Sequence, residues 1–192
     1  MSAVLDALHA RRSVSPRRME TGAPGPSLDQ IRAIVDAGCA APDHGLLRPW
    51  RFVYIPTGLR ETLGERFAVA EKEIRPEASA EHLATTRMKG IWGSETIALI
   101  ARIEPERDHI SETDQWLSVG AAMQNMHLAA EAFGWRAMVI SGPRLESQTL
   151  RTAFKLAPEE RLVGFLVMGT PSVPFPQPPR PTSAEKLTLW EG

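Results

Sequence analysis

The sequence has very little cysteine: Cys39 is the only one among 192 residues. A single cysteine cannot form an internal disulfide, so a disulfide-stapled secreted scaffold is excluded and a reducing compartment is favoured. Long apolar runs are also missing, because no segment approaches the roughly 18 apolar residues that a membrane-spanning helix needs. The opening segment, MSAVLDALHARRS, is too short and too mixed in character for a secretory signal. We therefore expect a cytoplasmic protein without a membrane span.

An excess of charge of one sign is absent as well. The 22 lysine and arginine residues nearly balance the 23 aspartate and glutamate residues, which leaves a formal net charge of −1. This balance gives no electrostatic reason to expect DNA, RNA or an anionic membrane surface as a partner. Three glycine-containing signatures are missing too: G-x-G-x-x-G, G-x-x-x-x-G-K-[ST] and G-x-S-x-G. The sequence therefore gives no support to a Rossmann site, a P-loop or a serine nucleophile elbow.

The sequence does contain the ordinary composition of a folded domain. The hydrophobic fraction is 43% and the charged fraction is 23%, and both values are typical of globular proteins. A chain of this length suits one domain with a proper core. Proline gathers near the end, over 171–181.

Apolar periodicity predicts helices and strands that alternate along the chain. The expected helices cover 4–8, 28–41, 58–90 with a break at Pro76, 114–134 and 145–156, and the expected strands cover 50–55, 96–103, 136–141 and 162–168. Ser27 and Gln30 form a capping-box signature at the start of the second helix. The alternation favours an α/β or α+β layered domain. Because 58–90 is charged and poor in large apolar residues, we interpret it as a partly exposed lid.

Two segments suggest a second copy of the chain. The helix 114–134 carries so few charges that we expect it to be buried nearly all round. The tail 171–192 is held extended by its prolines and ends in the apolar stretch 187–190, which needs a surface to dock on. A neighbouring subunit could receive the tail and cover the helix.

Three short segments could bind a ligand, and each also has a purely structural explanation. Arg11-Arg12-Ser13 follows a helix end, where cations are favoured by the macrodipole, but guanidinium groups and a hydroxyl could also grip a phosphate. Asp43-His44 near Cys39 could suggest zinc, yet no second cysteine or histidine spacing completes such a site. Ile140-Ser141-Gly142 could be a simple turn.

Together, the segments resemble the nitroreductase superfamily of flavoproteins, and most closely its small single-domain YdjA-like NAD(P)H nitroreductases. The matching pieces are ARRSVS at 10–15, AAPDHGLLRPWRFVYI at 40–55, SVGAAMQNMHLAAEAFG at 118–134, ISG at 140–142 and VGFLVMGTP at 163–171. They follow the family's order and approximate spacing across nearly the whole chain.

The resemblance implies a fold, an assembly and an activity. The fold would be α+β and nitroreductase-like, with a central mixed or antiparallel sheet flanked by helices in one domain, 1–192. The assembly would be a domain-swapped homodimer whose tail 171–192 wraps the partner subunit, with FMN at the interface. The activity would pass a hydride from NAD(P)H through the flavin to a nitroaromatic, quinone or similar acceptor by a ping-pong mechanism.

The resemblance also implies FMN-binding residues. Arg11, Arg12 and Ser13 would contact the phosphate and ribityl chain, and Ser15 stands where many relatives carry a second cation. Ala40, Pro42 and His44 would approach the flavin from the other subunit. Ile140, Ser141 and Gly142 would run beside the isoalloxazine ring, and Arg180 would be a tail cation for the phosphate. Because the flavin carries the chemistry, no catalytic acid or base and no metal ligand is expected.

Two other functions stay open on the sequence alone. Related folds perform dehalogenation, flavin fragmentation and azoline oxidation, so the reaction could differ while the flavin stays. The same pocket could also serve a flavin-binding module without enzymatic activity.

Overall fold

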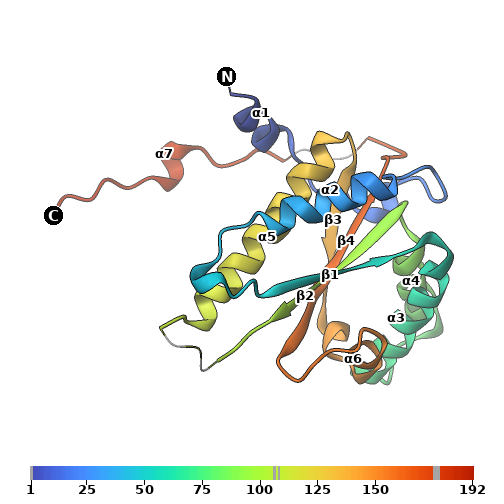
Figure 1. The fold of residues 1–192 in the computed structure, drawn as a ribbon. Coiled ribbons are helices and arrows are strands. Elements are labelled where there is room, and N and C mark those ends of the chain that lie inside the picture. The colour runs from blue at the N-terminus through green and yellow to red at the C-terminus, as the bar shows by residue number, and fades with distance from the viewer. Residues whose placement is uncertain (1, 106, 108, 175–177) are drawn as a thin grey trace.

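The centre of the molecule is an antiparallel sheet of four strands, with the order β1-β2-β4-β3 (Figure 1). In this computed structural model, residues 2–105, 107, 109–174 and 178–192 are described. The strands are β1 (Trp50–Ile55), β2 (Glu95–Arg102), β3 (Arg136–Ile140) and β4 (Glu160–Gly169). β2 and β4 are buried along most of their length, whereas β1 and β3 form half-buried edges. All four expected strands are confirmed to within two residues.

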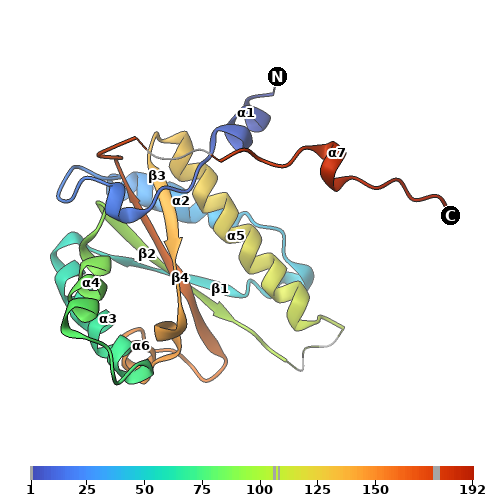
Figure 2. The same ribbon diagram turned by 180° about the vertical axis from the view of Figure 1, so that it is seen from behind.

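Helices cover both faces of the sheet (Figures 1 and 2). One face carries α2 (Leu28–Cys39) and α5 (Glu112–Ala132), and the other carries α3 (Arg60–Ile74), α4 (Ala80–Ile91) and α6 (Gln148–Ala153). Alternate strand residues point to opposite faces, so Ile97 packs in the core beneath α2 and α5 while Ala98 packs in the core beneath α3. This layered arrangement confirms the predicted α+β fold class.

The segment interpreted as a lid is in part a core element. On α3, Leu63 and Phe67 are buried, and the Phe67 ring meets the Phe165 ring of β4 edge-on with 4.8 Å between centroids. The lid interpretation is therefore wrong for α3. The small residues Gly64 of α3 and Gly90 of α4 let the two helices pack against each other without large side chains between them. The low content of large apolar residues in 58–90 therefore reflects the close packing of α3 against α4.

Arg60, the first residue of α3, holds the C-terminal end of α4 in place. Its buried guanidinium donates to the carbonyl oxygens of Gly90 and Gly93, each at 3.0 Å. Burial is the main reason that the pKa of Arg60 is lowered. The side chain satisfies carbonyl groups at the C-terminal end of α4 that no helical N–H can reach.

α5 starts earlier and is less enclosed than the sequence predicts. Ser111 and Asp114 form a capping box, so the helix begins at Glu112. One face packs on the sheet through Val119, Ala122, Met126 and Ala130. On the outer face, however, Leu117 is 67% exposed. The expectation that the helix is buried nearly all round is wrong for a single copy of the chain.

The expected helix 145–156 is divided in two. A short 3₁₀ helix, η4 (Pro143–Glu146), precedes α6, because the Ser147 hydroxyl accepts the Leu150 N–H and starts a new helix there. Three further 3₁₀ helices lie in the described chain: η1 (Pro16–Arg18), η2 (His44–Leu46) and η3 (Thr57–Leu59).

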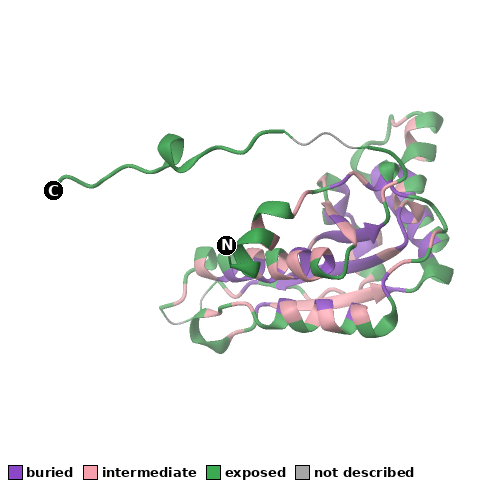
Figure 3. Ribbon diagram, turned by 90° about the horizontal axis from the view of Figure 1, so that it is seen from above, coloured by how far each residue is buried: buried purple, intermediate pink, exposed green. Residues whose placement is uncertain are grey.

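The chain ends lie outside the layered body. The first helix, α1 (Ala3–Ala10), has no buried residue. The described tail contains a short helix, α7 (Ser183–Lys186), started by a Thr182–Glu185 capping box. Figure 3 shows this segment as exposed, and Trp190 near its end is 90% exposed. In the part of the chain that the structure describes, no helix has the length and apolar character to cross a membrane.

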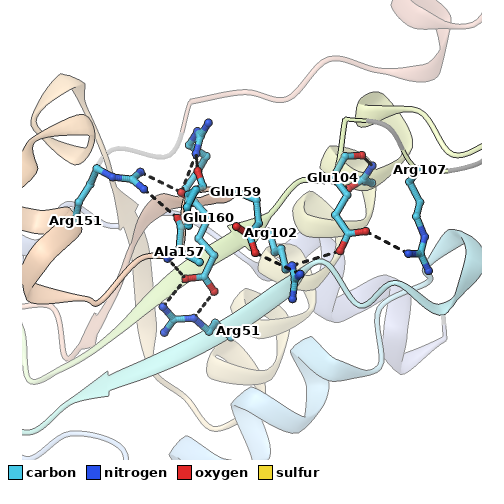
Figure 4. Close-up of polar contacts among 11 residues, drawn as sticks. Arg51, Arg102, Glu104, Arg107, Arg151, Ala157, Glu159 and Glu160 are labelled. Atoms are coloured by element: carbon cyan, nitrogen blue, oxygen red, sulfur yellow. Dashed lines mark hydrogen bonds and ion pairs between the residues drawn. The ribbon is translucent and has the colours of Figure 1, made fainter.

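An ion-pair network ties the edge strand β1 to β4 (Figure 4). Arg51 donates to both carboxylate oxygens of Glu160, at 2.6 and 2.8 Å. This paired geometry is the main cause of the lowered pKa of Glu160. Arg151 donates to the carbonyl oxygens of Ala157 and Glu160 nearby. The arginine that follows Trp50 in the sequence is therefore a structural group.

Candidate functional site

The segment after α1 runs along the outer edge of β3. Ser13 forms a parallel bridge with Ala137, and the Val14 N–H donates to the Ala137 carbonyl at 3.2 Å. Val14 is buried and packs against Ile140. The structure therefore brings two of the predicted site segments, 11–15 and 140–142, to the same edge of the sheet.

Arg11 and Arg12 both lie at the C-terminal end of α1. Arg12 Nη1 donates to the carbonyl oxygens of His9 and Arg11, at 2.6 and 3.1 Å. Arg11 Nη1 donates to the hydroxyl of Ser13 at 3.2 Å. The helix-end explanation of these arginines is thus correct, and it leaves donors free: Arg12 Nε is buried and has no hydrogen-bond acceptor within the described residues.

Arg180 of the tail reaches the same place. Its guanidinium donates to the carbonyl of Leu8 at 2.9 Å and to the carbonyl of Arg11. Desolvation, and then the charges of Arg12 and Arg11, lower the pKa of Arg180. Three guanidinium groups therefore lie close enough to repel one another, and a doubly charged anion would relieve that repulsion.

His127 lies close enough to Arg11 to be affected by its charge, and it was not singled out from the sequence. It is on α5 with 8% of its surface exposed. Burial, and then the charge of Arg11, lowers its pKa to about 4. The ring is therefore neutral near pH 7 and adds no further charge to the cluster. In the sequence, the one feature that could have drawn attention to His127 is its position in a helical segment without charged residues.

The turn after β3 has an open surface. Gly142 has φ of 130° and ψ of 173°, a region that is essentially restricted to glycine. Among the described residues, a Cβ placed there would find only Arg144 Nη1 within 4 Å, at 3.6 Å. Ser141 beside it is exposed. A flat ring could therefore approach the backbone of 140–142 closely.

A cavity of about 840 Å³ opens next to this turn. Trp116 of α5, Gly142 and Val163 of β4 contribute to its lining. Its size falls within the range of small-molecule pockets, which is about 300–1,000 Å³. Trp116 is a lining residue that the sequence suggested only as part of a helix face.

The third predicted segment lies elsewhere in the same chain. Ala40, Pro42 and His44 are exposed at the end of α2 and the start of η2. His44 Nδ1 is 3.9 Å from Asp114 Oδ2 in the first turn of α5. His127, near the arginines, is thirteen positions further along that helix, or about 20 Å at 1.5 Å per residue. One copy of the chain does not bring His44 to the arginine cluster.

The loop that carries His44 is held in an unusual backbone conformation. Leu46 and Arg48 have φ of 55° and 49°, which is uncommon for residues with a side chain. Asp43 supports the loop, because its carboxylate accepts the Arg48 N–H at 2.7 Å.

Among the described residues, no group of three or more histidine, cysteine or acidic side chains could hold a metal ion.

A second cavity, of about 820 Å³, lies at β1 on the opposite edge of the sheet. Val53, Leu63 and Phe154 contribute to its lining, with Arg66 and Lys155 among the charged members. None of the predicted flavin-binding residues takes part in it.

Known proteins resemble this chain along most of its length. The model of the nitroreductase family matches residues 8–170. "Putative NAD(P)H nitroreductase YdjA" of Escherichia coli (strain K12) is 31% identical over 171 residues, which cover 88% of each chain. A nitroreductase-like family protein from Bacillus cereus has a TM-score of 0.79 at 20% identity, covering 100% of this chain and 98% of its own. A nitroreductase with bound FMN from Bacteroides fragilis has a TM-score of 0.70 at 21% identity, covering 100% of both chains. The family match and the identity to the Escherichia coli protein show that this chain belongs to the nitroreductase family.

Proposed function

We propose that this chain is an FMN-dependent oxidoreductase of the cytoplasm. In this proposal, NAD(P)H supplies electrons for a nitroaromatic, a quinone or a similar small acceptor. Family membership supports it, as do the names of the relatives and the FMN bound in the Bacteroides fragilis structure. The observation that carries it is the convergence of an arginine cluster and an open glycine turn on one edge of the sheet.

The arginine cluster would hold the phosphate. Arg12 and Arg180 already use some donors on helix carbonyls, and Arg11 uses one on the Ser13 hydroxyl, but the buried Nε of Arg12 has no acceptor within the described chain. A phosphate oxygen would satisfy such a donor, and charge-assisted hydrogen bonds are the strong ones. Ser13 and Ser15 would offer hydroxyl groups to the ribityl chain.

The turn 140–142 would position the ring. When bound, FMN would accept two electrons from a nicotinamide and give them to the acceptor. The backbone of Ile140, Ser141 and Gly142 would lie beside the ring, and Trp116 would form a wall of the adjoining cavity. One cavity would serve the nicotinamide and the acceptor in turn, which gives ping-pong kinetics. No side chain is assigned as an acid or base.

Two copies of the chain would complete the site. The outer face of α5 combines exposed Leu117 with Gly120, whose added Cβ would meet nothing described within 4 Å. An uncharged helix face of this kind favours a homodimer contact. The partner would then supply Ala40, Pro42 and His44. In its own chain, His44 lies beside Asp114, about 20 Å along α5 from His127.

Each chain would form one domain, 1–192, whose tail 171–192 wraps the partner subunit. Leu187, Leu189 and Trp190 are 68%, 77% and 90% exposed in the single chain. Apolar side chains this exposed at the end of an extended arm gain stability by docking on a second copy.

The direct test is an anaerobic absorbance experiment on the purified protein with added FMN. We expect the spectrum of bound oxidised flavin to bleach with NADH or NADPH and to return when a nitroaromatic or quinone is added. A folded protein that takes up no FMN would contradict the proposal. Bound flavin that neither nicotinamide reduces would instead favour a different flavin reaction.

A further inference from the structure

A buried arginine lies directly after the glycine turn. Arg144 of η4 is 5% exposed, and its guanidinium carbon lies 5.0 Å from the centre of the Phe67 ring. Its Nη1 is 4.0 Å from Glu71 Oε2, and within the described residues its Nε has no hydrogen-bond acceptor. Buried guanidinium groups normally have their donors satisfied, so Arg144 is an unusually unsatisfied cation.

The surroundings of Arg144 hold more positive than negative charge. Glu71 is its carboxylate partner, and Glu71 is shared with Arg75 at 3.1 Å and His82 at 3.0 Å. Lys89 of α4 also lies close, because the charge of Arg144 contributes, after burial, to lowering the pKa of Lys89. Three cations, Arg144, Arg75 and Lys89, therefore face one carboxylate.

This excess of positive charge lies directly behind the proposed flavin surface. Arg144 Nη1 is 3.6 Å from the point where a Cβ of Gly142 would stand. Burial lowers the pKa of Arg144, as expected for a cation removed from water. Charges in such an environment interact more strongly than charges at the surface.

We propose that Arg144 is a positioning residue whose charge favours the reduced form of the flavin beside Gly142. The inference rests on the proposed function. NAD(P)H delivers two electrons and one proton to the ring and leaves as NAD(P)⁺, so the reduced ring carries one negative charge. A buried cation next to the turn stabilises that charge and leaves the oxidised, neutral ring almost unaffected. Glu71 opposes the effect and holds the guanidinium in place.

The test compares the Kd values for oxidised and reduced FMN, measured anaerobically at one pH. For Arg144→Gln we expect the ratio of the oxidised Kd to the reduced Kd to fall about tenfold, which lowers the potential of the bound flavin by about 30 mV. Arg144→Lys keeps the charge and should keep the ratio. Glu71→Gln removes the opposing charge and should raise the ratio. Arg75→Gln, at an exposed cation that shares Glu71, is the matched control and should change little.

The Kd ratio is expected to fall in Arg144→Gln and to rise in Glu71→Gln, and these opposite changes distinguish a charge effect from a structural effect. If Arg144→Gln and Glu71→Gln both weaken the two redox forms equally, or if Arg144→Lys fails to keep the ratio, the inference is wrong while the proposed function stands. If Arg144→Gln does not fold, Arg144→Lys and Glu71→Gln still decide the sign. A wild-type protein that binds neither form of FMN overturns both proposals.

Discussion

Arg12 satisfies the end of a helix and retains a donor that a ligand could use. Its Nη1 donates to the carbonyl oxygens of His9 and Arg11, while its buried Nε has no acceptor among the described residues. The two explanations of Arg11-Arg12-Ser13 that the sequence left open are therefore compatible. The sequence could place these arginines by their order in the family's segments, but the unsatisfied Nε depends on the folded geometry.

The phosphate assignment predicts a large effect from one pair of substitutions. Arg11→Ala with Arg12→Ala removes charge-assisted contacts worth about 1.5–3 kcal/mol each. FMN binding should weaken at least about a hundredfold, whereas riboflavin, which lacks the phosphate, should bind almost as in the wild type. Fluorescence titration measures both affinities.

The matched control for this pair is Arg17→Ala with Arg32→Ala. Both residues are exposed, and the Arg32–Asp29 ion pair has side chains that are 68% and 90% exposed. Surface pairs of this kind contribute little, so the control should bind FMN normally. Retention of stoichiometric FMN by a folded Arg11→Ala, Arg12→Ala variant would show that the phosphate lies elsewhere.

His127 gives a prediction about pH. Its pKa is about 4 in the folded chain and 6.5 in the reference state, mainly because of burial. The unfolded chain therefore binds more protons between these values, and stability is lost as the pH falls from about 6.5 to 4. The shift corresponds to about 3 kcal/mol. Denaturant unfolding of the FMN-free protein should show a shallower acid loss in His127→Gln, and parallel pH profiles would contradict this.

His127 and Arg144 show what the sequence could not reveal about the site. Both are polar residues whose burial is decided by packing between elements distant in sequence. Arg144 is covered by the Phe67 ring of α3, although 77 positions separate the two in the chain. A contact between residues so far apart in the chain leaves no local sequence pattern. The turn at 140–142 could therefore be predicted from the sequence, whereas the burial of Arg144 next to it could not.

The secondary-structure elements were largely predictable, because caps and apolar periodicity act locally. The Ser27–Gln30 capping box starts α2 as expected, and β1 covers the predicted 50–55. The errors have physical causes. α3 reaches the core through Phe67 although most of its residues are small or charged, and Ser147 divides the last helix. The Ser111–Asp114 capping box was present in the sequence and would have given the correct start of α5.

The outer face of α5 predicts a dimer contact that one charge can disrupt. Leu117 is 67% exposed in one copy, so Leu117→Glu should cost the isolated chain little. In a homodimer, two carboxylates would be buried near an uncharged surface, which is strongly unfavourable. Sedimentation should show a shift from dimer toward monomer, with weaker FMN binding.

Val69→Glu provides the comparison for this helix. Val69 lies on α3 and is 50% exposed, so the substitution adds the same charge to a different surface. It should leave the sedimentation profile unchanged. An unchanged profile for Leu117→Glu as well, in a wild-type protein shown to be dimeric, would mean that α5 is not the contact.

In a single copy of the molecule, the residues of the proposed binding site lie in two separate places. The arginine cluster and the glycine turn lie beside β3, while the loop with His44 lies near the other end of α5. The predicted family is confirmed by the match over residues 8–170. The assembly was predictable only as an implication of that family, because a contact between copies depends on surfaces that a single sequence does not align. It stays a prediction, as does the wrapping of the partner by 171–192.

Native mass spectrometry of the apo-protein during titration with FMN tests the central claim most directly, because it reports assembly and ligand count together. We expect one dominant species, a dimer that carries two FMN molecules, with no FMN on any residual monomer. Stoichiometric FMN on a monomer, or a dimer that remains free of FMN at saturating concentration, would contradict the account.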